Sequence, residues 1–155
     1  MRRAAVAELA AALLLALLCL APAAARAQAL EPLTVVTAAG PQRFQVEVAR
    51  TDADRAQGLM YRRTMAPDRG MLFDFGRVEP VAMWMQNTYL SLDMLFIRPD
   101  GVIARIAEDT EPLSTRVISS GEPVLSVLEV VAGTARRLGI KPGDRVEHPM
   151  FRPKR

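Results

Sequence analysis

Two carboxylates in apolar surroundings are the first residues to consider for chemistry. Asp93 lies within the run Leu92–Ile97, and Glu129 lies within the run Val124–Val131. Alternate side chains of a strand share a face, and both faces of each run are mainly apolar, so both carboxylates are expected to be at least partly buried. Because a buried charge without a partner is costly, each acid needs either a partner or a function.

Asp93 and Glu129 suggest two interpretations. As a catalytic pair they could perform acid–base chemistry of the glycosidase type, which needs two carboxyl groups roughly 5–10 Å apart. In the structural alternative, each accepts hydrogen bonds from an arginine or from backbone N–H groups. Arg62, Arg63 and Arg69 follow a predicted helix and could supply that charge. We favour the structural interpretation, because buried Asp and Glu almost always have partners.

A group of aromatic and polar residues predicts a small-molecule pocket. Trp84, together with Tyr61, Tyr89 and Phe73, could form apolar walls with a few polar groups among them. Filling of an ordinary core by these aromatic rings is the alternative. The candidate ligand-binding residues are Tyr61, Arg62, Trp84, Asn87, Thr88 and Asp93.

Methionines form a third candidate group. Met83 and Met85 share one face of a predicted strand and flank Trp84. Thioether sulfurs suit Cu(I), so a soft-metal site is one interpretation. Packing of flexible methionines in the core is the other, and we favour it because His148 is the single histidine of the chain. No cofactor is expected.

Several catalytic motifs are absent from the sequence. It contains no G-x-G-x-x-G or G-x-x-x-x-G-K-[ST] phosphate loop and no G-x-S-x-G nucleophile elbow. One histidine cannot build a multi-histidine zinc site. Enzymatic activity is therefore uncertain, and the sequence favours a non-catalytic role.

The N-terminus has the order of a secretory signal peptide. Arg2 and Arg3 precede an apolar run over residues 9–20, and Ala25-Arg26-Ala27 forms an A-x-A cleavage site. The run is shorter than the ~20 residues of a membrane-spanning helix, although a retained anchor is the alternative. We expect residues 1–27 to be removed and the protein to be periplasmic or extracellular, with no membrane association after cleavage.

Export changes the bulk properties of the chain. Cys19, the single cysteine, leaves with the leader, so the mature protein has no disulfide partner. The charge of +3 becomes +1, because removal of Arg2, Arg3, Arg26 and Glu8 leaves 17 basic and 16 acidic residues. This balance gives no reason to expect nucleic-acid binding. The remaining divisions are a linker at 28–32, one domain at 33–150 and a basic tail at 151–155.

The elements that must position these residues are mostly strands. Alternation, turn residues and a capping box at residues 51–54 predict about eight mostly antiparallel strands and two short helices in a single-domain β-sandwich or barrel. Nine segments are candidates for these strands, namely 33–37, 43–50, 71–75, 81–86, 92–97, 102–107, 114–119, 124–131 and 145–148, and the predicted helices are 52–60 and 134–138.

Short phrases of the sequence resemble a known family. They are Gly58-Leu59-Met60-Tyr61-Arg62, Gly70-Met71-Leu72-Phe73, Trp84-Met85-Gln86-Asn87-Thr88, Leu92-Asp93, Val127-Leu128-Glu129-Val130 and Gly139-Ile140-Lys141-Pro142-Gly143-Asp144. In this order they are similar to the domain of unknown function 192, over about residues 34–149. The resemblance implies a mainly-β, often exported domain and no particular activity.

Together these observations predict an exported, non-catalytic binding or accessory domain whose ligand is an unknown small molecule. The alternatives are a carboxylate-dependent hydrolase that uses Asp93 and Glu129, and a copper-binding protein that uses Met83 and Met85.

Overall fold

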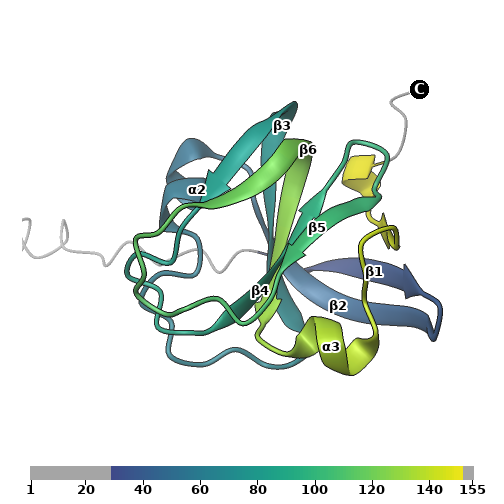
Figure 1. The fold of residues 1–155 in the computed structure, drawn as a ribbon, viewed down its shortest axis with the longest axis horizontal. Coiled ribbons are helices and arrows are strands. Elements are labelled where there is room, and N and C mark those ends of the chain that lie inside the picture. The colour runs from purple at the N-terminus through teal and green to yellow at the C-terminus, as the bar shows by residue number, and fades with distance from the viewer. Residues whose placement is uncertain (1–28, 152–155) are drawn as a thin grey trace, which may run out of the picture.

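The computed structural model describes residues 29–151 (Figure 1). The predicted leader and residues 152–155 of the basic tail lie outside this range. The strands are β1 (Glu31–Thr37), β2 (Gly40–Ala49), β3 (Arg69–Met83), β4 (Leu92–Ile97), β5 (Ile103–Ala107), β6 (Ile118–Val131) and β7 (Arg145–Glu147). The helices are α2 (Asp52–Gln57), α3 (Thr134–Leu138) and the single 3₁₀ turn η1 (Pro149–Phe151). No helix of the described range is long and apolar enough to cross a membrane.

Within residues 29–151 one curled sheet of seven strands forms a half-barrel, in the order β5-β4-β6-β3-β2-β1-β7. Neighbouring strands are antiparallel, except that β2 and β3 are parallel. A bridge between Val102 and Arg145 links the two ends of this order, beside a 2.9 Å bond from Ile103 N to Asp144 O. The prediction of a mainly-β, mostly antiparallel domain with two short helices is confirmed.

Strands β3 and β6 are longer than predicted and run side by side (Figure 1). The sequence predicted a break at residues 76–80, because glycine and proline interrupt strands. The structure keeps the pairing through register shifts between Asp74 and Glu79 and between Pro80 and Ala82. Such bulges bend a strand without ending it, so four predicted strands become two bent ones.

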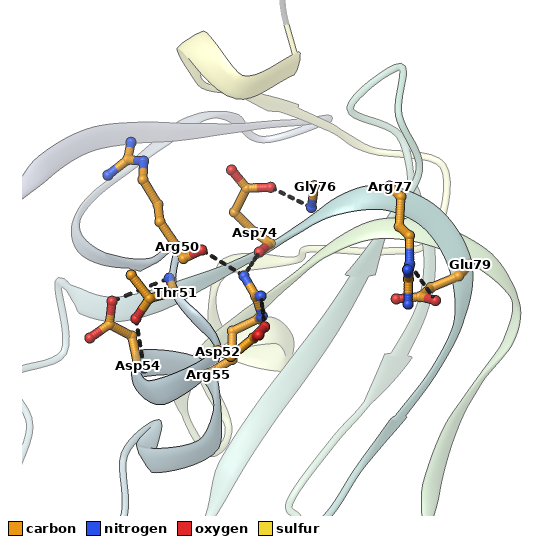
Figure 2. Close-up of polar contacts among 9 residues, drawn as sticks. All are labelled: Arg50, Thr51, Asp52, Asp54, Arg55, Asp74, Gly76, Arg77 and Glu79. Carbon is orange, nitrogen blue, oxygen red and sulfur yellow. Dashed lines mark hydrogen bonds and ion pairs between the residues drawn. The ribbon is translucent and has the colours of Figure 1, made fainter.

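Helix α2 begins as predicted and ends earlier. Thr51 Oγ1 accepts a 3.1 Å hydrogen bond from Asp54 N, and Asp54 Oδ2 accepts one from Thr51 N at 3.3 Å (Figure 2). This is the predicted capping box. Gly58, with φ of 49°, ends the helix before residue 60.

Two apolar clusters lie on opposite faces of the central strands. The first takes residues from every strand of the described sheet and from α3, and the second lies between β3, β4 and β6 and the loops that cover them. On β4, Leu95 and Ile97 belong to the first cluster, whereas Leu92, Met94 and Phe96 belong to the second. Every residue of β4 is therefore buried.

Asp93 faces the first cluster and is fully buried. Its Oδ1 accepts hydrogen bonds from Asp109 N at 3.0 Å and Gly133 N at 3.2 Å, and its Oδ2 accepts one from Ala135 N at 2.8 Å. Gly133 is the N-cap of α3 and supplies no side-chain cap. Asp93 therefore satisfies the start of α3 from a neighbouring strand. The structural interpretation is confirmed for Asp93, with backbone N–H groups in the place of an arginine.

We expect Asp93→Ala to lower the free energy of unfolding by roughly 3–5 kcal/mol, because three backbone N–H groups lose a charged acceptor. Asp93→Asn should be milder, since it keeps one accepting oxygen. Urea unfolding measures the stability of both variants.

Ser126→Ala is the control, because Ser126 is equally buried and its hydroxyl has no partner within residues 29–151. This substitution should change the free energy of unfolding by less than about 1 kcal/mol. Equal losses in Asp93→Ala and Ser126→Ala would contradict the anchoring role.

Candidate ligand-binding site

A cavity of about 270 Å³ lies where α2 and the loop after it cover β3 and β6. Its walls combine aliphatic, aromatic and thioether groups with the polar groups of Arg55, Gln57, Thr88 and Glu129. The lining residues are Arg55, Ala56, Gln57, Gly58, Leu59, Met60, Phe73, Phe75, Ala82, Met83, Trp84, Thr88 and Glu129. Because an apolar cavity of about 150 Å³ holds benzene, this one is large enough for a small organic molecule.

The end of α2 shapes one wall of this cavity. Gly58 turns the chain with a positive φ, and a Cβ at this position would lie 3.1 Å from the ring of Phe73. The glycine therefore lets the backbone pass close over the ring. Leu59, which follows, packs in the second apolar cluster with Phe73.

Glu129 lies on β6 at the inner side of the cavity. It is opposite Met71 of β3 and Met94 of β4, and the residue is 4% exposed. Its carboxyl group has no hydrogen-bond or ion-pair partner among residues 29–151. The structural interpretation, which expected an arginine or backbone N–H groups at each acid, is therefore wrong for Glu129.

Burial raises the pKa of Glu129 from 4.5 to about 8, and no neighbouring charge offsets this effect. At neutral pH the carboxyl group is therefore mostly protonated. In that state it can donate an O–H hydrogen bond into the cavity, which a carboxylate cannot do.

Asp93 and Glu129 are not brought together. Glu129 pairs in register with Met94, while Asp93 pairs with Val130. Because adjacent positions on a strand point to opposite faces, the two acids lie on opposite sides of the sheet. A substrate in the cavity beside Glu129 cannot reach Asp93, so the geometry gives no support to a two-carboxylate hydrolase.

Arg55 supplies the guanidinium in the cavity wall and is held by the chain around it. Its Nη1 donates to Arg50 O at 2.7 Å and to Asp74 O at 2.5 Å, and its Nη2 pairs with Asp52 (Figure 2). These contacts join α2 to the end of β2 and to β3. They also occupy much of the donor capacity of the guanidinium.

Three loops, which we call the rim loops, are residues 58–68, 84–91 and 108–117, and the first two contribute residues to the cavity wall. Backbone hydrogen bonds connect them, from Tyr61 N to Asn87 O at 2.9 Å and from Leu113 N to Thr88 O at 3.0 Å. Within residues 29–151, the non-glycine residues with positive φ are Tyr61, Asn87, Asp109 and Leu113, and all four lie in the rim loops. Such backbone strain is concentrated at functional sites in many proteins.

The rim loops also carry exposed apolar side chains. Trp84, in the cavity wall, is 52% exposed. The other exposed large apolar side chains of the rim loops are Tyr61, Tyr89, Leu113 and Val117. The Arg63 guanidinium lies 4.9 Å from the centre of the Tyr89 ring.

Only some of the residues that the sequence proposed for ligand binding line this cavity. Trp84 and Thr88 line the cavity, as does Phe73, whereas Tyr61 and Asn87 do not. Arg62 pairs with Glu47 through two bonds of 2.5 and 2.7 Å and lines another depression.

The two candidate metal ligands are in different surroundings. Met83 lines the cavity beside Glu129, while Met85 is buried and its sulfur accepts a 3.2 Å bond from Thr110 Oγ1. The described residues contain no group of three or more His, Cys, Asp or Glu that could hold a metal ion. The geometry therefore does not favour Met83 and Met85 as a joint copper site.

Sequence reasoning missed Arg55, Met60 and Phe75 as cavity residues. Arg55 and Met60 belong to the predicted helix 52–60, whose contact face could not be assigned without knowing which strand it covers. Phe75 alternates with Phe73 along β3, and this spacing is a signal that could have placed both rings on one face.

We expect Glu129→Gln to change how stability depends on pH. Because the pKa of Glu129 is raised in the folded state, the wild type should lose stability as pH rises from about 4.5 to about 8, by up to about 5 kcal/mol from this group. Glu129→Gln should lack this loss and be the more stable protein at pH 9. Urea unfolding at pH 5 and pH 9 measures the change in the free energy of unfolding of each protein.

Glu147→Gln, at an exposed position of β7, is the matched control and should keep the wild-type profile. Identical profiles for Glu129→Gln and the wild type would show that Glu129 is not buried without a partner.

Comparisons with known proteins agree with this architecture. The DUF192 family, described as "Uncharacterized ACR, COG1430", matches residues 34–148. Among curated proteins, none matches the chain. A crystal structure from Sinorhizobium meliloti 1021, described as a "putative transcription regulator", is 56% identical with a TM-score of 0.76 and covers 78% of this chain and 95% of its own.

A second crystal structure, of a protein of unknown function from Novosphingobium aromaticivorans DSM 12444, is 37% identical with a TM-score of 0.78. The match covers 81% of this chain and 89% of that one. The family match spans most of the chain, and β4 and β6, which carry Asp93 and Glu129, lie within it. This protein belongs to the DUF192 family.

Proposed function

We propose that this protein binds a small, mainly apolar organic molecule in the cavity beside Glu129. The observation that carries the proposal is the carboxyl group of Glu129, which is buried, has no partner within residues 29–151 and borders a cavity with aromatic, aliphatic and thioether groups in its walls. Such a group costs stability, and a leucine or methionine would fill this place more cheaply. Strongly perturbed acids in cavities are typical of binding and catalytic sites.

A binding role fits the cavity better than a catalytic one. Its lining residues contain a single carboxyl group, Glu129, and no histidine, cysteine or lysine. The hydroxyl of Thr88 donates to Gln86 O at 3.2 Å and makes no hydrogen bond with Glu129, the one carboxyl group among the lining residues. A nucleophile–base pair of the kind used in covalent catalysis is therefore missing from these walls.

The description of one relative as a transcription regulator does not alter this proposal. DNA binding depends on basic side chains that contact phosphates. Among residues 29–151, acidic residues slightly outnumber basic ones. The cavity, with its aromatic and thioether walls, offers apolar contacts rather than a phosphate-binding surface.

Ligand binding can be tested by closing the cavity. Ala82 is an exposed residue that lines it, so Ala82→Trp should fill the entrance with little effect on the fold. We expect small aromatic molecules to raise the melting temperature of the wild type, as any ligand of the folded state does, and not that of Ala82→Trp. Ala39→Trp, in the exposed β1–β2 turn, is the matched control and should respond like the wild type. Equal responses of Ala82→Trp and Ala39→Trp would refute the cavity as the site.

We also propose that the protein acts outside the cytoplasm, on the support of the signal-peptide pattern in residues 1–27. Mass spectrometry and N-terminal sequencing of the protein from cell fractions should find a chain that begins at Gln28 in the periplasmic or secreted fraction. A chain that keeps residues 1–27 in the membrane fraction would instead indicate a retained anchor.

A further inference from the structure

The surroundings of Glu129 restrict the kind of ligand that the cavity can take. Resting on the proposed function, we propose that the ligand is an uncharged, mainly apolar molecule with one hydrogen-bond-accepting oxygen, such as a ketone or an ester, which accepts the O–H bond of the Glu129 carboxyl group. The neighbours of Glu129 on the adjacent strands are Met71 and Met94, which leave that O–H without a strong acceptor.

The remaining walls do not satisfy Glu129 either. The hydroxyl of Thr88 donates to Gln86 O, neither Thr88 nor the amide of Gln57 is hydrogen-bonded to Glu129, and Met60 and Met83 offer only weakly accepting sulfurs. A donor held away from bulk water without an acceptor is unfavourable. A ligand oxygen beside Glu129 would recover this loss, whereas a hydrocarbon of the same shape would not.

Charged ligands fit this cavity less well. From α2, Arg55 presents a positive charge to the same cavity and would repel a cation. A cation would also need Glu129 ionised, although burial raises the pKa of this group to about 8. An anion would find the donors of Arg55 engaged by Arg50 O, Asp74 O and the Asp52 carboxylate.

The titration of Glu129 makes this inference measurable. Its register partners are Met71 on β3 and Met94 on β4, and Phe73 and Thr88 line the same cavity; none of these four side chains titrates. Arg55 is the other charged group in the cavity walls, and arginine keeps its charge over the whole range used. A change in affinity around pH 8 therefore reports Glu129.

Three molecules of similar shape test the ligand class: acetophenone, which has one accepting oxygen; ethylbenzene, which has none; and phenyltrimethylammonium, which has a fixed positive charge. Binding to the full-length protein is measured by ligand-observed NMR at pH 6 and pH 9. At pH 6 acetophenone should bind most tightly. Its affinity should fall about tenfold at pH 9, because about a tenth of Glu129 then stays protonated.

Two variants separate hydrogen bonding from packing. Glu129→Gln keeps an N–H donor without titrating, so acetophenone binding should persist and lose its pH dependence. Glu129→Leu has no donor, so acetophenone and ethylbenzene should then bind equally.

Tighter binding of phenyltrimethylammonium than of acetophenone, or an acetophenone affinity that rises with pH, would overturn the proposed ligand class. Equal binding of ethylbenzene and acetophenone to the wild type would overturn it too, while leaving the cavity as a binding site if Ala82→Trp abolishes both. Failure of all three molecules to bind would refute the ligand class and the proposed function together.

Discussion

The alternation of side chains along β4 and β6 is the constraint on which the two acids of this domain depend. The pairing of Met94 with Glu129, and of Asp93 with Val130, places one carboxyl group on each face of the sheet. Asp93 thereby meets the backbone N–H groups at the start of α3, while Glu129 meets a cavity. A shift of one residue along a strand moves a side chain to the other face of the sheet. That shift separates the anchoring position of Asp93 from the cavity position of Glu129.

The two acids have opposite effects on stability. On folding, Asp93 exchanges its hydrogen bonds to water for hydrogen bonds from three backbone N–H groups. These bonds satisfy both the carboxylate and the otherwise uncapped start of α3. On folding, Glu129 loses water from its carboxyl group to a site with methionine and aromatic side chains, and it gains no hydrogen bond within the described residues. Such a residue lowers the stability of the fold, and residues of this kind are common at binding and catalytic sites.

The mainly-β class, the capping box of α2 and the burial of both acids could be predicted from the sequence, because alternation, turn residues and N-cap residues act locally. The bent course of β3 could not, because Gly76 and Pro80 interrupt strands in general and only the partner β6 holds this one together. The partners of the acids also depend on distant segments. Asp93 meets Gly133 and Ala135, some forty residues away, while Arg62 pairs with Glu47 and reaches neither acid.

Hydrogen bonds connect the buried carboxylate of Asp93 to the rim loops. Asp109, at the start of the third rim loop, has a left-handed backbone with φ of 50°, and its N–H donates to Asp93. A strained residue of this kind persists only where its surroundings hold it. From that loop, Leu113 N bonds Thr88 O, and Thr88 lines the cavity. The third rim loop is thus hydrogen-bonded at one point to Asp93 and at another to Thr88, so it joins the anchored acid to the cavity wall although Asp93 does not line the cavity.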